Sequence, residues 1–560
     1  MSAEQALEGL DEDQRRAATY FSGPLAIIAG AGSGKTTTVS ARLAYGCLSG
    51  ELDSERILAL TFTTRAAGQL RSRLASLNAP AIATRTIHSA ALRQLRYFWP
   101  MLDGTRPPQV LADGASLVRD AAESLGVRLA PRAVRDLLTD ITWAKSNFID
   151  ETRFAAEYSA RRGQAGNAHT AARIYAEYEL LKRKTFAMDF DDVLLYLLAL
   201  LDEHGDALAM VRRQYQHITV DEFQDLTPLQ FRVLKEWVGP RGSVCAVGDP
   251  AQAIYGFAGA TASYLRRFEH EFGRAHVVQL RTNYRSAKTI VSAAVHVGDQ
   301  DKPLSHAQPT AQLGSVLQLE HADAAAEVYA IGERIIHLLQ LGQQPQGIAV
   351  LVRQQEQARH LATELRGMGI PTVERAATDL FERPEVRQAL HRLRTAALLE
   401  PDADALHTVT RIATELGWTQ APDPSAQPSL ADSTWDSLAI LVEVARRLHE
   451  QDSQTAIFDV LEELERRAEA FDIPAAPAVS LLTMHAAKGL EWDVVFIPSV
   501  NNTAQEGRNR DGGAAAARDE EARLLYVAMT RAKQQVVLSW SQQAGGRSPL
   551  LSGLPRDVAS

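Results

Sequence analysis

Short runs of apolar residues, many of them β-branched, recur along the chain and alternate with longer stretches of helical periodicity. Such runs predict strands that are buried on both faces, as in parallel sheets. The first half of the chain holds runs at residues 25–29, 57–62, 218–221, 244–248 and 277–280. The second half holds runs at residues 348–352, 479–483, 494–497 and 536–540. The pattern predicts two doubly wound parallel α/β domains, each with its functional edge at the carboxyl ends of the strands.

Each set of strands is interrupted by a long stretch of mainly helical pattern, about the size of a small domain. We therefore expect four parts. The first α/β domain takes residues 1–94 and 189–278, with a helical insertion at 95–188. The second takes residues 279–373 and 474–560, with a helical insertion at 374–473. Loops are expected at 421–428 and in the Ala/Gly-rich stretch 501–518.

Composition excludes several classes of protein. The 560 residues are 46% hydrophobic and 23% charged, as is usual for globular proteins. We find no apolar run of membrane-spanning length and no signal peptide at the start, so we expect no membrane association. Cys47 and Cys245 both lie in apolar surroundings, which favours free thiols over a disulfide framework or a zinc site. We expect a cytoplasmic protein.

The charge is unevenly distributed. The net charge of −9 argues against a basic protein that coats nucleic acid. Residues 56–102, however, contain no Asp or Glu. The arginines of this stretch are Arg56, Arg65, Arg71, Arg73, Arg85, Arg93 and Arg96. Together with interleaved aromatic and hydroxyl side chains, they predict contact with a phosphate backbone, the alternative being an ordinary solvated face.

A phosphate-binding loop follows the first predicted strand. Residues 29–36 read Ala-Gly-Ala-Gly-Ser-Gly-Lys-Thr, with Ala29 in place of the first glycine of the usual pattern. The backbone N–H groups of such a loop point at a polyphosphate, Lys35 reaches the terminal phosphates and the Thr36 hydroxyl ligates Mg²⁺. This pattern predicts a nucleotide site.

Two adjacent carboxylates close the predicted strand 218–221. At the sheet edge that also holds the phosphate loop, Asp221 would hold Mg²⁺ through water and Glu222 would orient and deprotonate the attacking water. The alternative is an acidic first turn of a helix.

With these residues in place, an ordered series of motifs resembles the UvrD/Rep type of superfamily 1 DNA helicases over nearly the whole chain. The segments that carry the resemblance are residues 10–14, 60–67, 86–89, 189–192, 247–257, 280–286, 483–492 and 526–533. The resemblance implies two RecA-like domains, an ATP-dependent motor that moves 3′→5′ on single-stranded DNA, and ATP and Mg²⁺ as cofactors.

The resemblance also assigns the ATP site. The nucleotide-binding residues it implies are Gln14, Ala29, Gly30, Ala31, Gly32, Ser33, Gly34, Lys35, Thr36, Thr37, Tyr284, Arg285, Glu491 and Arg531. Gln14 would read the adenine edge, Tyr284 would stack on adenine and Glu491 would contact the ribose. The catalytic residues are Lys35, Glu222, Gln252, Arg285 and Arg531. Because the two arginines come from the second predicted domain, ATP would close the two domains and hydrolysis would release them.

The expected DNA-binding residues lie in the same motifs: Thr61, Phe62, Thr63, Arg65, Thr86, His88, Tyr255, Phe257 and His485. Phe62 and Phe257 are the expected stacking platforms, with core packing as the alternative. For His88 and His485 a structural hydrogen bond stays open beside a DNA contact or coupling role. Trp99, Trp143 and Trp418 have no motif support and are expected in the core.

The chain departs from the family pattern at several places. Ala258 stands where an arginine is common beside the stacking aromatic, the second insertion is short, and we expect no nuclease domain after the last strand. We expect a helicase that acts on single-stranded DNA and on junctions with duplex, in repair or replication restart. Repair or replication proteins are the expected partners of a monomer or loose oligomer. The alternatives are a translocase that strips proteins from single strands with little unwinding, and a nucleotide-gated regulatory subunit.

Overall fold

The computed structural model describes residues 2–111, 113–162, 165–241, 243–298, 305–306, 314–374, 383–400, 403–418, 431–451, 457, 460–461, 464, 478–502 and 514–554. The chain divides into two compact units. Unit 1 comprises Met1–Arg285, Ala294–Pro309 and Thr503–Tyr526. Unit 2 comprises Ser286–Ala293, Thr310–Asn502 and Val527–Ser560.

A six-stranded parallel sheet organises unit 1. Its strands, in spatial order, are β3 (Ala83–Thr86), β2 (Ile57–Thr61), β6 (His217–Val220), β7 (Val244–Gly248), β1 (Leu25–Ala29) and β8 (His276–Leu280). Because every pairing is parallel, all carboxyl ends meet at one edge of the sheet. The ends of β1, β6 and β7 therefore bring the phosphate loop, the paired carboxylates and the segment after Gly248 to the same edge.

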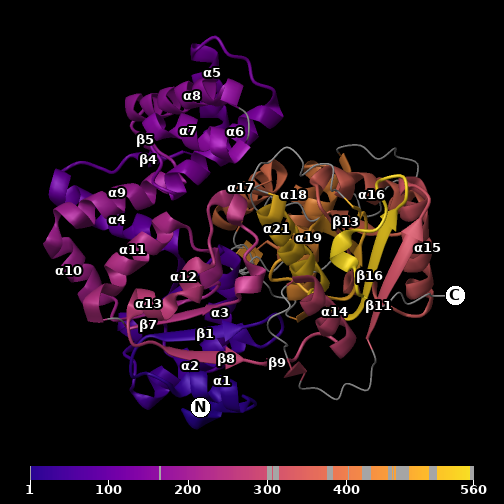
Figure 1. Cartoon of the computed structure of the whole chain (residues 1–560), viewed down its shortest axis with the longest axis horizontal. Coiled ribbons are helices and arrows are strands. Elements are labelled where there is room, and N and C mark those ends of the chain that lie inside the picture. Colours follow the sequence, from indigo (N-terminus) through magenta and orange to yellow (C-terminus); the bar gives the residue numbers. More distant parts are fainter. Residues whose placement is uncertain are drawn as a thin grey trace. The chain divides into compact units, whose positions relative to one another are not determined.

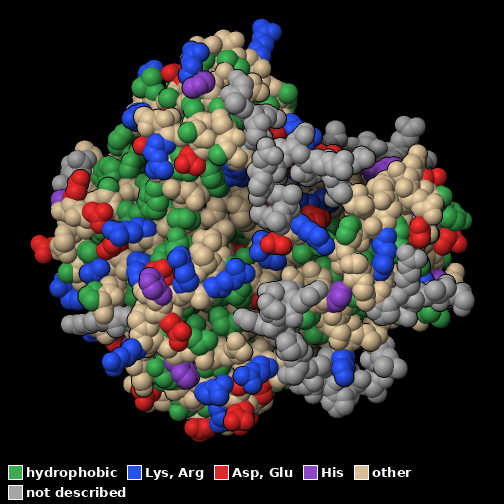
Figure 2. All heavy atoms as spheres, in the orientation of Figure 1, with side chains coloured by type: hydrophobic (Ala, Val, Ile, Leu, Met, Phe, Trp, Pro, Cys, Tyr) green, Lys and Arg blue, Asp and Glu red, His purple; other side chains and the backbone are tan. Residues whose placement is uncertain are grey.

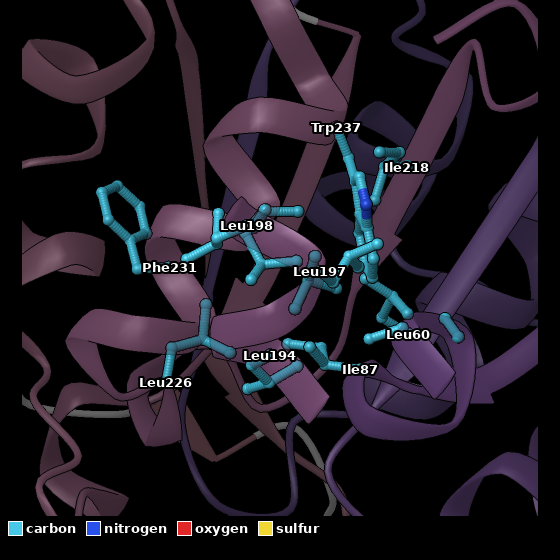
Figure 3. Packing of buried hydrophobic residues seen from close by; sticks show 14 of the residues in the cluster. Leu60, Ile87, Leu194, Leu197, Leu198, Ile218, Leu226, Phe231 and Trp237 are labelled. Carbon is cyan, nitrogen blue, oxygen red and sulfur yellow. The ribbon is translucent and has the colours of Figure 1, made fainter. Parts of the chain in front are cut away.

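Both faces of this sheet are buried. Successive side chains of β2 alternate between two cores, with Leu58 and Leu60 in one and Ile57 and Ala59 in the other. The first core packs against α4 (Ile87–Asp103), α9 (Phe190–Glu203) and α11 (Pro228–Val238), and Trp237 lies among its leucines (Figure 3). The second core packs against α1 (Glu12–Thr19), α2 (Lys35–Ser49) and α3 (Thr64–Ser76). Figure 1 shows α4, α9 and α11 on one side of the sheet and α1 and α2 on the other.

The first helical insertion has a core of its own within unit 1. Its helices are α5 (Gly114–Ser124), α6 (Pro131–Ser146), α7 (Glu151–Arg162) and α8 (Ala165–Lys184). The chain enters and leaves it through a short parallel pair, β4 (Gln109–Val110) with β5 (Ala187–Met188). Further elements of the unit are α10 (Gly205–Gln214), α12 (Ser263–Arg266) and α13 (Phe268–Phe272).

Unit 2 holds a second six-stranded parallel sheet. Its strands, in spatial order, are β11 (Ser315–His321), β16 (Ala532–Ser541), β15 (Trp492–Ile497), β12 (Ile348–Val352), β14 (Val479–Thr483) and β13 (Thr372–Glu374). One face packs against α15 (Ala324–Gln340) and α16 (Gln355–Gly367). The helices α17 (Pro384–Leu399), α18 (Ala405–Glu415) and α19 (Ala431–Gln451) share a separate core. Two further helices, α14 (Lys288–Gly298) and α21 (Ala514–Met529), are divided between the two units.

The predicted fold class is confirmed, and every predicted strand is a strand. The sequence patterns did not indicate β3, β11 and β13, which lie at sheet edges and carry several polar residues. The expected loop 421–428 and most of 501–518 lie outside the described residues. Trp99 and Trp418 each pack partly buried against a core cluster, as expected. The four-part division of the chain stays a prediction.

Candidate functional site

The phosphate loop joins β1 to α2 through two glycines in left-handed conformation. Gly32 has φ +71° and Gly34, the N-cap of α2, has φ +79°. Both glycines are closely approached, because a Cβ on Gly34 would lie 2.6 Å from Gln14 Nε2 and one on Gly32 would lie 2.8 Å from Asn283 Nδ2. Lys35 Nζ donates to the Ala29 carbonyl at 3.2 Å. The loop therefore presents a glycine-lined backbone and a lysine at the N-terminus of a 15-residue helix, which suits a polyphosphate.

Gln14 is bonded to the phosphate loop and to its own helix cap. It is 3% exposed, and its Nε2 donates to the Ser33 carbonyl at 3.0 Å. Its backbone N–H and Oε1 form a capping box with Asp11, at 2.7 and 3.1 Å. These bonds fix the orientation of the carboxamide beside the loop, where we had placed an adenine-reading residue.

The segment of Tyr284 and Arg285 lies against the same loop. Asn283 Nδ2 donates to the Ala31 carbonyl at 2.6 Å, and the Tyr284 backbone N–H donates to the Gly32 carbonyl at 2.8 Å. The Tyr284 hydroxyl donates to Asp11 Oδ2 at 2.5 Å, and its ring is 38% exposed. Burial and the bond to Asp11 raise the pKa of Tyr284 to about 12. The structure thus brings Tyr284 to Gln14 through Asp11. Arg285, which we expected in the second domain, is the last residue of the first stretch of unit 1.

The paired carboxylates begin a chain of hydrogen bonds that ends at Gln252. Glu222 follows β6 with a left-handed φ of +54°, and Gln224 Nε2 donates to its Oε2. Gln224 Oε1 accepts from the Asp249 backbone N–H at 3.0 Å, and Gln252 Nε2 donates to Asp249 Oδ2 at 2.8 Å. Gln224 is fully buried and Gln252 is 2% exposed. We call this series the Glu222–Gln252 chain.

Aromatic side chains follow Gln252 at the same sheet edge. The rings of Phe62 and Tyr255 are stacked, with centroids 4.9 Å apart and planes at 20°. Tyr255 meets Phe257 at 6.1 Å and 60°. Phe62 is 37% exposed and Phe257 is 41% exposed, although large apolar side chains are usually buried. We call the Phe62, Tyr255 and Phe257 rings the aromatic platform, two of whose side chains, Phe62 and Phe257, are exposed.

The predicted hydroxyl contacts serve local structure. Thr61 is buried and donates to the Thr63 carbonyl at 3.0 Å. Thr63 caps α3 by accepting from the Ala66 N–H at 3.1 Å, and Thr86 caps α4 by accepting from the Ser89 N–H at 3.2 Å. The Thr37 hydroxyl accepts from Arg73 Nη2 at 2.8 Å. The Arg65 side chain lies outside the described residues.

His88 lies beside an exposed ring that the sequence analysis did not select. Burial lowers the pKa of His88 to about 4, so its imidazole is neutral at neutral pH. Its Nε2 has no hydrogen-bond partner among the described residues. The ring of Phe190 lies 5.3 Å away and is 64% exposed. Phe190 directly follows the N-cap of α9 and precedes two aspartates of the first turn. A single aromatic residue among these acidic residues was the sequence signal that could have identified it.

The arginine-rich stretch is partly occupied by contacts within unit 1. Arg56 pairs with Asp53 at 3.1 Å, and Arg71 donates to the Thr84 carbonyl at 3.3 Å. On the face drawn in Figure 2, basic and acidic side chains are interspersed. The stretch therefore supports protein structure at several positions, in addition to any phosphate contact.

In unit 2, the remaining predicted residues are His485, which follows β14, Glu491, which precedes β15, and Arg531, which follows α21. Arg531 is 2% exposed, and its Nε donates to the Val527 carbonyl at 3.0 Å. Glu491 pairs with Lys533 at 2.9 Å. Burial, aided by the charge of Arg353, lowers the pKa of His485 to about 4.

Comparison with known proteins identifies the family. The UvrD/REP helicase N-terminal domain family matches residues 10–273, and the UvrD-like helicase C-terminal domain family matches residues 278–421 and 409–543. The chain belongs to the UvrD/Rep family of DNA helicases. It is 35% identical over 578 residues to the ATP-dependent DNA helicase UvrD2 of Mycobacterium bovis, covering 98% of this chain and 81% of that protein. It is 27% identical to the ATP-dependent DNA helicase UvrD1 of Mycobacterium leprae, covering 96% and 83%.

As a member of this family, the chain is an ATP-hydrolysing DNA helicase. The resemblance inferred from the ordered motifs is thereby confirmed. Among the described residues, we find no helix with the length and apolar character needed to cross a lipid bilayer.

Proposed function

We propose that this UvrD-type helicase moves 3′→5′ along single-stranded DNA, driven by ATP hydrolysis at the phosphate loop, and unwinds duplexes ahead of it in repair or replication restart. The direction of movement and the repair role rest on the family resemblance, and one observation carries the coupling of hydrolysis to DNA. The Glu222–Gln252 chain ends three residues before Tyr255, which stacks on Phe62. A change at the hydrolytic carboxylate therefore has a short bonded route to a surface on which a base can stack.

At the ATP site we assign roles to this chain's own residues. The glycine-lined loop and Lys35 bind the phosphates, Gln14 orients the adenine, and Tyr284 covers it. Glu222 accepts the proton of the attacking water, and Gln252 senses the γ-phosphate. Arg285 and Arg531 stabilise the negative charge that develops on the transferred phosphoryl group.

The donor set suits Mg²⁺, because a hydroxyl and a carboxylate are the oxygen ligands that this ion prefers. Thr36 and Asp221 would hold it. When bound, the ion would neutralise negative charge on the phosphates.

On the DNA side, we propose that bases stack on the aromatic platform and on Phe190. Stacking on an aromatic side chain contributes about 1–3 kcal/mol per base. For His88 we propose a DNA contact or coupling role, because its buried Nε2 has no hydrogen-bond partner among the described residues. Helices α3 and α4 start near Thr63 and Thr86, where their first N–H groups suit phosphates.

Titration of the ATPase with single-stranded DNA tests the DNA path. Phe62→Ala should raise the DNA concentration for half-maximal stimulation by about 5- to 150-fold, the equivalent of the stacking energy, and leave basal hydrolysis unchanged. Tyr329→Ala, which removes an exposed ring of α15 at a position assigned no DNA role, is the matched control and should behave as wild type. If Phe62→Ala leaves the DNA concentration for half-maximal stimulation unchanged, the aromatic platform does not bind the DNA strand.

A translocase that unwinds poorly is the second candidate, and Ala258 favours it. Residue 258 lies in the short helix that carries Phe257, where the family pattern has a cation. Stimulated hydrolysis without unwinding would support this candidate. Hydrolysis indifferent to DNA would support a nucleotide-gated regulatory subunit and contradict both motor proposals.

A further inference from the structure

The first helical insertion contacts the backbone of the aromatic platform directly. Phe257 lies in the single-turn helix Gly256–Ala258, and its carbonyl accepts a hydrogen bond from Arg161 Nη2 at 2.6 Å. Arg161 lies near the end of α7, 96 positions earlier in the chain. The bond joins a charged donor to a backbone acceptor, which makes it stronger than a bond between neutral groups.

Arg161 is itself held in place by the insertion. Its guanidinium carbon lies 4.4 Å over the centroid of the Trp143 ring, and its Nε lies 3.7 Å from Asp140 Oδ1. Asp140 is 1% exposed and the Arg161 side chain is 22% exposed. A planar cation between an aromatic face and a buried carboxylate keeps a fixed orientation. We expect Trp143 in the core, and its ring also packs against the Arg161 guanidinium.

A second contact lies at the end of the same turn. Gly259 has φ +94°, and a Cβ built there would lie 2.8 Å from Asn147 Nδ2 and 3.3 Å from Ser146 Cβ. Asn147 in turn donates from Nδ2 to the Trp143 carbonyl at 2.8 Å. The carboxyl end of α6 therefore packs against the turn with no space for a side chain between them.

The other side of α6 is fixed by a buried charge cluster. Lys145 Nζ contacts Asp189 Oδ2 at 2.7 Å and Glu179 at 3.2 Å, and also bonds to Asp192. Lys182 contacts the same three carboxylates at 2.5–2.7 Å. Those carboxylates lie close enough together to hold a metal ion, but two ammonium groups fill the space between them. The cluster is therefore an anchor that joins α6 and α8 to the start of α9.

These contacts link α6 to the segments that carry two of the rings that we assign to DNA. Phe190 directly follows Asp189 of the charge cluster, and Phe257 is bonded to Arg161 on α7, which rests on α6. Ala258 supplies no cation beside the platform, whereas Arg161 brings one from a different element.

We propose that Arg161 is a positioning residue, which holds the Tyr255–Phe257 turn in the orientation that receives the DNA strand. The inference rests on the proposed role of the aromatic platform. Because Arg161 Nη2 binds the Phe257 carbonyl, it acts on the backbone of the turn. Without it, the turn gains conformational freedom, and DNA binding must then restrict that freedom at a cost in affinity.

The test uses the full chain and three variants. Arg161→Met keeps an aliphatic chain over Trp143 but removes the donor, and Arg161→Lys restores one donor without the planar group. Arg153→Met is the control, because Arg153 lies on the same helix, is 61% exposed and pairs with Glu157 at 3.8 Å. For each variant, basal ATPase, the half-maximal DNA concentration and the melting temperature are measured.

We expect Arg161→Met to raise the half-maximal DNA concentration about tenfold, the equivalent of one charged hydrogen bond. Basal kcat should stay near wild type, whereas the melting temperature should fall because the buried Asp140 carboxylate loses this cation. Arg161→Lys should recover part of the DNA affinity, and Arg153→Met should match wild type. If the half-maximal DNA concentration rises in Phe62→Ala but stays at the wild-type value in Arg161→Met, the positioning role alone is overturned. Wild-type values in both variants would overturn the platform and this inference together. Equal losses of basal activity and melting temperature in Arg161→Met would show a merely structural role and also overturn it.

Discussion

Glu222 combines the proposed chemistry with an unusual backbone. Its φ of +54° is left-handed, a conformation that costs a residue with a side chain about 1–2 kcal/mol. The surrounding bonds hold it there, since its N–H donates to Asp221 Oδ1 at 3.0 Å and its carboxylate accepts from Gln224. Backbone strain of this kind gathers at functional sites. One bond thus holds the Glu222 backbone and another holds its carboxylate.

We predict that Glu222→Gln binds ATP with near wild-type affinity and loses turnover by at least about 10²–10⁴-fold, because the carboxamide cannot accept a proton from water. Equilibrium binding of a fluorescent ATP analogue and steady-state hydrolysis separate the two effects. Glu203→Gln, at an exposed position of unit 1, is the matched control. If Glu222→Gln hydrolyses ATP within a few fold of the wild-type rate, Glu222 is not the general base.

His88 predicts a pH dependence of stability. The pKa of His88 in the folded chain is about 4, below the ordinary value of 6.5. As the pH falls, His88 therefore takes up a proton in the unfolded chain before it does so in the folded chain. Its contribution to stability is therefore present above pH 6.5 and is lost between pH 6.5 and pH 4. His485, with a pKa also near 4, contributes with the same sign.

We expect His88→Asn to lose less melting temperature than wild type between pH 7 and pH 4.5, because asparagine does not titrate. Thermal unfolding at several pH values measures this. His270→Asn, at a side chain 83% exposed, should keep the wild-type pH profile. Identical profiles for His88→Asn and wild type would contradict the account of this histidine.

At the scale of elements, helix α2 begins and ends with a glycine in left-handed conformation. Gly34 has φ +79° and Gly50 has φ +80°, so a Cβ strains the backbone alike at both. Their surroundings differ, because a Cβ on Gly34 would lie 2.6 Å from Gln14 Nε2, whereas one on Gly50 meets nothing within 4 Å. Gly34 and Gly50 are therefore a matched pair of substitution sites, at which the backbone conformation is the same and only the surroundings differ.

We predict that Gly34→Ala and Gly50→Ala each destabilise the protein by about 1–2 kcal/mol of backbone strain, with a further loss in Gly34→Ala because its methyl group displaces the buried Gln14 carboxamide. Only Gly34→Ala should also weaken ATP binding, because its methyl group displaces the carboxamide that we assign to adenine. Melting temperature and ATP-analogue affinity are measured for both. Equal ATP affinities for the two variants would argue against Gln14 as the adenine contact.

The element scale also shows what the sequence could reveal. Strands buried on both faces, such as β1 and β7, are continuous apolar runs and could be predicted within a residue or two. Edge strands such as β11 and β3 are only partly buried and mix polar with apolar residues, so their pattern was too weak. Phosphate-loop and carboxylate residues were predictable because their function fixes their local spacing.

At the scale of the whole molecule, the supporting residues could not be predicted. Gln224 acts through two bonds, one of them to a segment 25 positions away, and Arg161 meets Phe257 across 96 positions. Nothing local marks such pairs, because the fold alone brings them together. The assignment of Arg531 to the ATP site rests on the family resemblance and is part of the proposal.

The most direct test of the account is unwinding of duplexes with either a 3′ or a 5′ single-stranded tail, at saturating ATP. We predict DNA-stimulated hydrolysis and strand separation from the 3′ tail only, both abolished in Glu222→Gln. Unwinding from the 5′ tail alone, or hydrolysis at the same rate with and without single-stranded DNA, would contradict the proposal that ATP hydrolysis at this loop drives 3′→5′ movement.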